Sequence, residues 1–166
     1  MKIHDDHLYH GAALIQIAEH PQFTAINAMK LKKNIVHTAY KINDDIGIYL
    51  KYARRPTKAF KEYPFTFNKE HLNDLSAIAT STNKLYIILV CVKGQEICCI
   101  SYRELSTLIE RRKKAKKDDE DQYTILVTIP TGKSMRVYVN VPGEKKKILG
   151  RQLVVSRNAF PSKLFR

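Results

Sequence analysis

Basic side chains in three separate runs are the residues of this sequence with the clearest chemical use. The first run begins at residue 54, the second fills residues 111–117, and the third centres on residues 145–147. Lysine and arginine neutralise phosphate groups and release counterions, so such runs are typical of proteins that bind nucleic acids. We expect phosphate contacts from nine side chains: Arg54, Arg55, Lys58, Arg112, Lys113, Lys114, Lys146, Lys147 and Arg151.

The distribution of charge along the chain favours the same interpretation. The 166 residues include 29 Lys or Arg and 16 Asp or Glu, which gives a formal net charge of +13. Residues 133–166 alone hold nine basic side chains and one acidic side chain. A positive field concentrated in one part of the chain fits a polyanion-binding face better than an evenly solvated surface. The competing interpretation is that the runs are ordinary solvated faces.

Aromatic residues beside basic ones add possible stacking surfaces for bases. They are Tyr52, Tyr138, Phe160 and Phe165. Nothing in the sequence resembles a recognition helix or an aromatic RNA-binding signature, so we expect little sequence specificity, and both DNA and RNA are open as ligands. An acidic protein is the alternative partner, and the hairpin expected within residues 123–141 would then offer an edge for strand addition. A homodimer through an apolar edge is a further alternative.

Hydrophobic patterning predicts the elements that must position these side chains. Residues 85–92 form an unbroken apolar run, typical of a strand buried on both faces, and residues 96–100 return as a second strand. Ser101 and Glu104 form a capping-box pattern that predicts a helix ending in the second basic run. Further strands are expected over residues 36–42, 48–53, 63–67, 123–129, 135–141 and 153–155, and further helices over 8–20, over 24–33 and after Asn68.

These elements predict a single α+β domain over residues 1–166, with a mixed or mostly antiparallel sheet flanked by about three to four helices. Its parts are an N-terminal helical segment (8–33), an α/β core (35–117) and a C-terminal basic β segment (122–156). No apolar stretch approaches the roughly 20 residues that span a bilayer, so no membrane partner is expected. Cys91, Cys98 and Cys99 fall in expected core strands, and their odd number favours reduced thiols and a cytoplasmic location.

Two other motifs have ordinary structural explanations. Gly132-Lys133-Ser134 resembles the end of a phosphate loop, but Val127 stands where that loop needs its first glycine. The residues after Ser134 alternate as a strand, so we interpret this motif as a hairpin turn. His4, His7 and His10 follow one another at a spacing of three, which would suit a metal on one side of a helix or simply a frayed terminus.

Acidic residues around the first expected hairpin raise an enzymatic alternative. Asp44 or Asp45 directly precedes the second expected strand, Glu62 lies at the third, and Glu19 lies at the end of the first helix. The order of expected elements over residues 8–92 resembles the core of the PD-(D/E)xK nucleases, which place an acid on the second strand and an acid-x-lysine pair on the third. The acid-x-lysine motif itself is absent, since Tyr49 stands two residues before Lys51.

This resemblance implies a metal-dependent nuclease. Asp45, Glu19 and Glu62 would hold Mg²⁺ or Mn²⁺, and Lys51 would stabilise the charge that develops on the phosphate. The alternative for these acids is that they cap turns and balance nearby lysines. Binding of nucleic acid through phosphate contacts requires no cofactor, so a metal is expected only if the protein is a nuclease. Whether the protein is an enzyme is therefore open at this point.

Overall fold

The apolar run at residues 85–92 forms β5 (Lys84–Cys91), a strand near the centre of a five-stranded sheet in the computed structural model. Its neighbours are β3 (Ile46–Ala53), which runs parallel to it, and β6 (Glu96–Ser101), which runs antiparallel. Residues Ile87–Cys91 are all buried, as expected for a strand that is covered on both faces. The sheet is mixed, with strand order β1-β2-β3-β5-β6.

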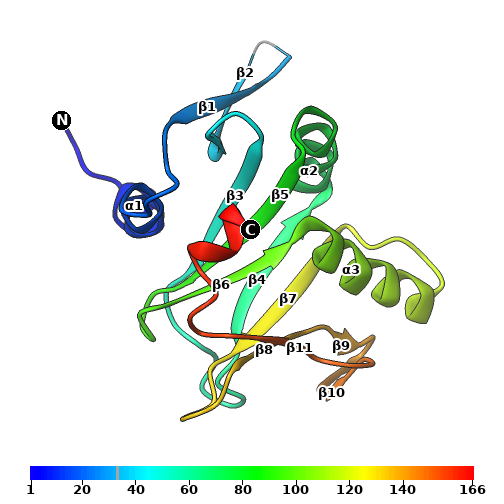
Figure 1. Ribbon diagram of the computed structural model, residues 1–166. Helices are drawn as coiled ribbons and strands as arrows, with labels where there is room; N and C mark the ends of the chain where they lie inside the picture. Colours follow the sequence, from blue (N-terminus) through cyan, green and yellow to red (C-terminus); the bar gives the residue numbers. More distant parts are fainter. Residues whose placement is uncertain (33) are drawn as a thin grey trace.

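The outer strands of this sheet form a long hairpin that extends from the body of the molecule (Figure 1). β1 (Ile26–Leu31) pairs antiparallel with β2 (Asn34–Ile42), and a bulge interrupts their register after Ala28. β2 in turn pairs with β3 only over Ala39–Ile42, so the remainder of the hairpin leaves the sheet. The structure describes residues 1–32 and 34–166.

A second, antiparallel sheet packs against the first, with strand order β11-β8-β7-β4. Its strands are β4 (Tyr63–Asn68), β7 (Gln122–Thr128), β8 (Met135–Tyr138) and β11 (Leu153–Val155). The facing sides of the two sheets share one core, which includes Phe65 and Phe67 of β4 and Ile87 and Leu89 of β5. A two-stranded ribbon of β9 (Asn140–Val141) and β10 (Glu144–Ile148) extends from this sheet.

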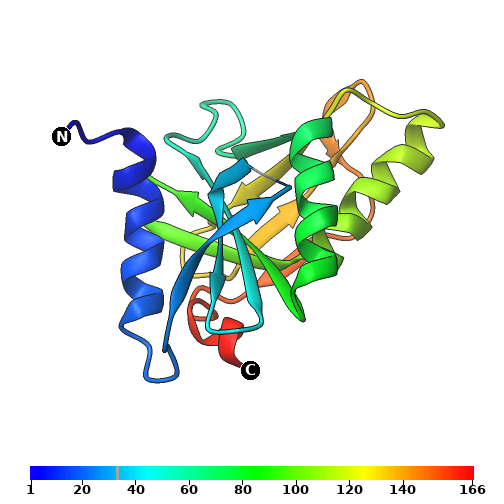
Figure 2. The same ribbon diagram turned by 90° about the horizontal axis from the view of Figure 1, so that it is seen from above.

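Three α-helices cover the sheets within the described residues: α1 (Asp5–Ala18), α2 (Lys69–Ser81) and α3 (Tyr102–Lys116). α1 lies on one side of the molecule and α2 and α3 lie on the other (Figure 2). Ala13 and Ile17 of α1 share a second core cluster with Leu164 from a C-terminal 3₁₀ helix, η1 (Ser162–Phe165). These elements confirm the predicted α+β class and the mixed, mostly antiparallel sheets.

Local signals located α2 and α3 correctly. The side chain of Asn68 accepts a hydrogen bond from the backbone N–H of His71, which caps α2. The side chain of Ser101 accepts from the N–H of Glu104 at 3.0 Å, and Glu104 accepts from the N–H of Ser101 at 2.9 Å. This is the predicted capping box, which satisfies backbone donors that the first turn of a helix leaves free.

Two predicted elements are wrong. The helix expected over residues 24–33 is instead β1, although Lys33 lies outside the described residues. Its Ala, Met, Leu and Lys residues favour a helix locally, but antiparallel pairing with β2 decides the conformation. The basic loop expected at residues 144–147 is instead β10, whose five residues are all exposed and therefore carry no apolar alternation. The first helix also begins earlier than expected, at Asp5.

The cysteines behave as the sequence predicts. Cys91, Cys98 and Cys99 are free and buried. Burial raises the pKa of Cys91 and of Cys99 to about 12, so these thiols stay protonated and are poor nucleophiles near neutral pH. None of the helices in the described residues is long and apolar enough to cross a bilayer.

The capping box of α3 gives a test of the fold. We expect Ser101→Ala to lower the free energy of unfolding by about 1 kcal/mol, because it removes the acceptor of the Glu104 N–H. Ser76→Ala, at an exposed site inside α2, is the matched control and should change stability little, since alanine is a better helix former than serine. Urea denaturation measures both, and equal stability of Ser101→Ala and the parent would contradict the assignment.

Candidate nucleic-acid interface

A groove of about 760 Å³ lies on the outer face of the second sheet. Its floor follows from alternation: Tyr63, Phe65 and Phe67 of β4 point into the core, so Pro64 points outward. Pro64 pairs with Leu126 of β7, and Leu126 pairs with Tyr138 of β8. Pro64, Leu126 and Tyr138 therefore lie side by side on the face of the second sheet that points away from the core.

One wall of the groove is the loop between β3 and β4, which contains the first basic run. Thr57, Ala59 and Phe60 line the groove from this loop. The loop is closed on itself, because the N–H of Thr57 donates to the Glu62 carbonyl at 2.8 Å and the N–H of Lys61 donates to the Thr57 carbonyl at 2.9 Å. These bonds hold the exposed residues 58–61 on a fixed turn.

The opposite wall is the β9–β10 ribbon, which contains the third basic run. Gly143, Glu144 and Lys145 line the groove from its turn. The Asn140 side-chain amide donates to the Lys145 carbonyl at 2.9 Å and fixes the ribbon. Two of the three predicted basic segments therefore face each other across one cavity.

Arg112 of α3 joins the ribbon to the rest of the groove. Its Nε and Nη2 donate to the two carboxylate oxygens of Glu120 at 2.8 and 2.9 Å, and its Nη1 donates to the Asn140 carbonyl at 2.6 Å. The side chains of Arg112 and Glu120 are only 22% and 13% exposed. Because its guanidinium is engaged in this way, we assign Arg112 to the wall of the groove rather than to the phosphate contacts predicted for it.

A buried carboxylate and a tyrosine lie beside the floor. Glu62 is 6% exposed and accepts a hydrogen bond from the Tyr138 hydroxyl through Oε2. Burial and this hydrogen bond raise the pKa of Tyr138 well above its ordinary value, so its hydroxyl stays protonated. Within the described residues, Oε1 of Glu62 has no hydrogen-bond partner, so the carboxylate keeps acceptor capacity next to the groove.

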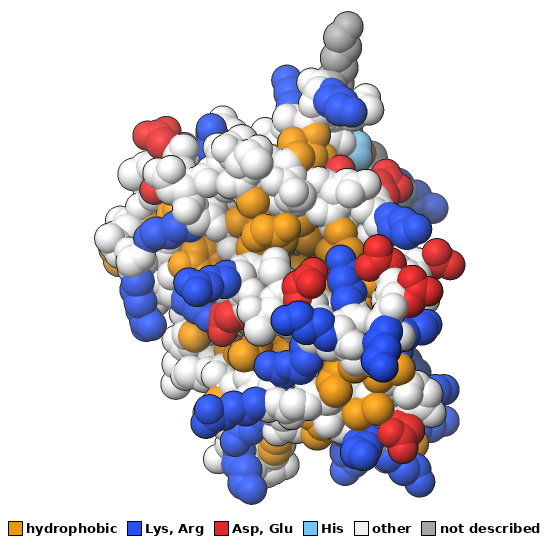
Figure 3. Space-filling view, turned by 90° about the vertical axis from the view of Figure 1, so that its right-hand side faces the viewer, with side chains coloured by type: hydrophobic (Ala, Val, Ile, Leu, Met, Phe, Trp, Pro, Cys, Tyr) orange, Lys and Arg blue, Asp and Glu red, His pale blue; other side chains and the backbone are white. Residues whose placement is uncertain are grey.

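The other predicted basic residues divide into paired and unpaired groups. Arg54 forms an ion pair with Asp5, and Lys113 forms ion pairs with Glu110 and Asp119. Six predicted side chains are exposed and form no ion pair among the described residues: Arg55, Lys58, Lys114, Lys146, Lys147 and Arg151. Figure 3 views the side of the molecule that carries α3, where Lys and Arg side chains spread over the middle and lower parts and a group of acidic side chains lies at one edge.

The predicted stacking residues are engaged in packing instead. The Tyr52 ring lies 4.9 Å from that of Tyr9, and the Phe165 ring stacks on His20 at 4.3 Å. Tyr138 and Phe160 are buried. The aromatic residue that the sequence analysis missed is Phe60, which lines the groove and is 39% exposed. Its position between Lys58 and Lys61 was the available signal, since aromatic residues interleaved with basic ones are typical of nucleic-acid-binding loops.

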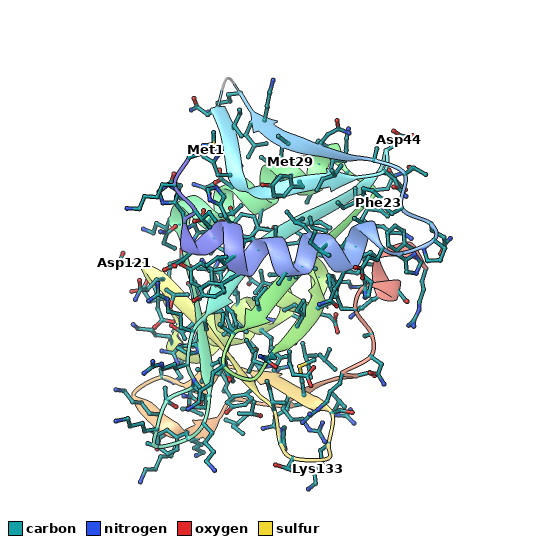
Figure 4. The ribbon with its side chains drawn as sticks, turned by 90° about the vertical axis from the view of Figure 1, so that its left-hand side faces the viewer. Met1, Phe23, Met29, Asp44, Asp121 and Lys133 are labelled. Carbon is teal, nitrogen blue, oxygen red and sulfur yellow. The ribbon has the colours of Figure 1, made fainter. Side chains whose placement is uncertain are left out.

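The four residues predicted for a nuclease site do not converge. Asp45 directly precedes β3, and Lys51 lies six residues further along the chain, or about 20 Å at about 3.3 Å per residue. The Nζ of Lys51 lies over the ring of Phe67. Phe67 follows Glu62 by five residues along an extended strand, which separates Lys51 from Glu62 by roughly 16 Å at about 3.3 Å per residue. Glu19 follows the last turn of α1. Figure 4 shows Asp44, the neighbour of Asp45 in the chain, at the same end of the molecule as Phe23, which follows Glu19 by four residues.

Metal binding has no further support among the described residues, where no group of three or more His, Cys, Asp or Glu side chains is placed to hold an ion. The rings of His4 and His7 are tilted, with their centroids 5.3 Å apart, while His10 is buried against Tyr52. Lys51 has a distinct environment, with its Nζ 3.4 Å from Nδ1 of His71. Burial lowers the pKa of this lysine to about 8.

The hairpin of β7 and β8 does not offer the free edge predicted for strand addition. β7 pairs with β4 and β8, and β8 pairs with β7 and β11, so both strands already have neighbours on each side. The Pro130–Gly132 segment between them is a turn, as predicted, and not a phosphate loop.

Comparison with models of protein families gives no match, and comparisons with curated proteins and with solved structures give no significant match. The resemblance of residues 8–92 to the PD-(D/E)xK core therefore stays a prediction.

The Arg112–Glu120 pair predicts a pH-dependent contribution to stability. The hydrogen bonds from Arg112 hold the pKa of Glu120 below its ordinary value of 4.5, so the ionised carboxylate stabilises the fold above that pH and loses this effect as the pH falls below it. We expect Glu120→Gln to lower the free energy of unfolding by about 1–3 kcal/mol at pH 7, and by less below about pH 4.5.

Urea denaturation between pH 3.5 and pH 7 measures this difference. Asp119→Asn is the matched control: its side chain is 77% exposed, so its pair with Lys113 should contribute little at any pH. A Glu120→Gln effect that is constant across the range would contradict the ionic origin of the contribution.

Proposed function

We propose that this protein binds nucleic acid through phosphate contacts along the walls of the groove, with little sequence specificity. The observation that carries the proposal is the convergence of separate basic segments on one cavity. The β3–β4 loop and the β9–β10 ribbon are about 80 residues apart in sequence and line opposite walls, and the basic end of α3 holds the ribbon through Arg112.

The charge arrangement supports a polyanionic ligand. Lys145 lines the groove beside Glu144, and Lys58, Lys61, Lys146 and Lys147 are exposed on the two segments that form its walls. An exposed lysine can contact a phosphate group as a point charge, without a fixed geometry. Such contacts do not depend on the base sequence. The formal net charge of +13 adds a long-range attraction that should speed association with DNA or RNA at low salt.

Two alternatives stay predictions. A metal-dependent nuclease would have to use carboxylates other than Asp45, Glu19 and Glu62 together, since no such group of three is placed to hold an ion in the described part of the chain. A basic protein-interaction module, or a homodimer, would have to use a surface other than the paired β7–β8 hairpin. Neither alternative explains why basic segments line the groove, so we take nucleic-acid binding as the leading function.

The salt dependence of binding tests the proposal. Each phosphate contact with a single strand contributes a slope of about −0.7 to log K against log salt. We expect the variant with Lys58, Lys146 and Lys147 changed to Gln to lose about 2 from the magnitude of this slope, with an affinity loss on the order of tenfold to a hundredfold near 0.1 M salt. Fluorescence anisotropy with a labelled oligonucleotide measures both quantities.

The matched control changes Lys2, Lys30 and Lys32 to Gln, which removes the same charge from exposed sites in the N-terminal part of the chain. Equal losses in both triple variants would mean that net charge alone drives association. Parallel incubations in EDTA and in Mg²⁺ or Mn²⁺ should both leave the oligonucleotide intact. Metal-dependent cleavage that Asp45→Ala abolishes would instead establish the nuclease alternative.

A further inference from the structure

The lining of the groove contains carboxylates that phosphate contacts alone do not explain. Exposed lysines lie on the two segments that form its walls, and Lys145 lines the groove beside the exposed Glu144. Glu62 lies beside the floor, and Glu120 lies at the end nearest α3. Arg112 and Lys116 neutralise Glu120, but the Glu62 carboxylate is bonded to the neutral Tyr138 hydroxyl. A phosphate inside the groove would meet Glu62 and be repelled, so the interior suits a neutral group that donates hydrogen bonds.

Phe60 adds a flat apolar surface at the same place. It lines the groove, is 39% exposed, and lies on a turn that backbone hydrogen bonds close. An exposed ring next to Lys58 and Lys61 matches the arrangement by which proteins stack an unpaired base while lysines contact the adjoining phosphates. The groove volume of about 760 Å³ also falls in the range of small-molecule sites.

From these observations we infer that the groove receives an unpaired, amino-bearing nucleobase of a single-stranded nucleic acid. The base stacks on Phe60, its exocyclic amino group donates to Oε1 of Glu62, and its flanking phosphates lie on the lysines of the two walls. Bases in a duplex are stacked and paired and cannot enter such a site, whereas single-stranded bases can be turned outward. This inference rests on the proposed function, and it adds that the ligand is a single strand with an unpaired base in the groove.

The composition of the chain allows a direct measurement of stacking, because it contains no tryptophan. Phe60→Trp places the only tryptophan of the chain in the groove, and the substitution occurs on an exposed loop. We expect oligo(dC) to quench this tryptophan on binding, since a base stacked on the indole quenches its emission. Ile15→Trp is the control: that site is 61% exposed on α1, outside the groove, and its emission should stay unchanged.

Two comparisons complete the experiment. Phe60→Ala should weaken binding of oligo(dC) about 5- to 150-fold, which corresponds to the 1–3 kcal/mol of one stacked base, and should leave the affinity for a blunt duplex unchanged. Oligo(dT) lacks the exocyclic amino group, so it should bind the parent protein about 2- to 10-fold more weakly than oligo(dC).

The outcomes separate this inference from the proposed function. Salt-dependent anisotropy without quenching of the Phe60→Trp variant, or with equal quenching of the Ile15→Trp variant, would overturn the base site and leave phosphate binding intact. Equal affinities for oligo(dC) and oligo(dT) would overturn the contact with Glu62. If neither single strands nor duplexes bind at low salt, the proposed function itself is wrong. Selective quenching at Phe60→Trp with preference for oligo(dC) supports the inference.

Discussion

The parallel pairing of β3 with β5 is the constraint on which the rest of the structure depends. Two parallel neighbours cannot be joined by a tight turn, so the chain must leave the sheet at Ala53 and return at Lys84. This crossover contains the β3–β4 loop, β4 and α2. Because β4 joins the second sheet on the way, the crossover builds both the core between the sheets and, on its outer side, one wall and part of the floor of the groove. The candidate site is thus a direct product of the topology.

A second feature is that arginines and lysines have different roles in the structure. A high net charge would suggest that any arginine or lysine on the surface contributes equally to binding. Arg111 and Arg112 instead donate to backbone carbonyls of the segment that contains the ribbon: Arg112 bonds Asn140, and Arg111 bonds Leu149 and Arg151. The lysines of the walls stay exposed. Arginine suits the structural role because its fixed, planar set of donors can satisfy several acceptors at once, while lysine remains available as a mobile point charge.

Sequence reasoning located the elements whose signals are local. The apolar run of β5, the Ser101 cap and the Asn68 cap each depend on residues within a few positions, and all three predictions are confirmed. β1 and β10 were missed because their conformation depends on pairing with β2 and β9. The groove was missed for a related reason: the row Pro64–Leu126–Tyr138 exists only once distant strands have paired in register. The basic runs indicated a type of ligand, but only the fold distinguishes Lys146, which is exposed, from Arg112, which is internally bonded.

The groove is the proposed meeting point of protein and ligand, and an NMR titration of ¹⁵N-labelled protein with a short single-stranded oligonucleotide at low salt tests this location most directly. The largest amide shift changes should fall on the β3–β4 loop around Phe60 and on the β9–β10 ribbon around Lys145, with α1 unaffected. Changes concentrated on α1 or on the β1–β2 hairpin, with the loop and the ribbon unchanged, would contradict it.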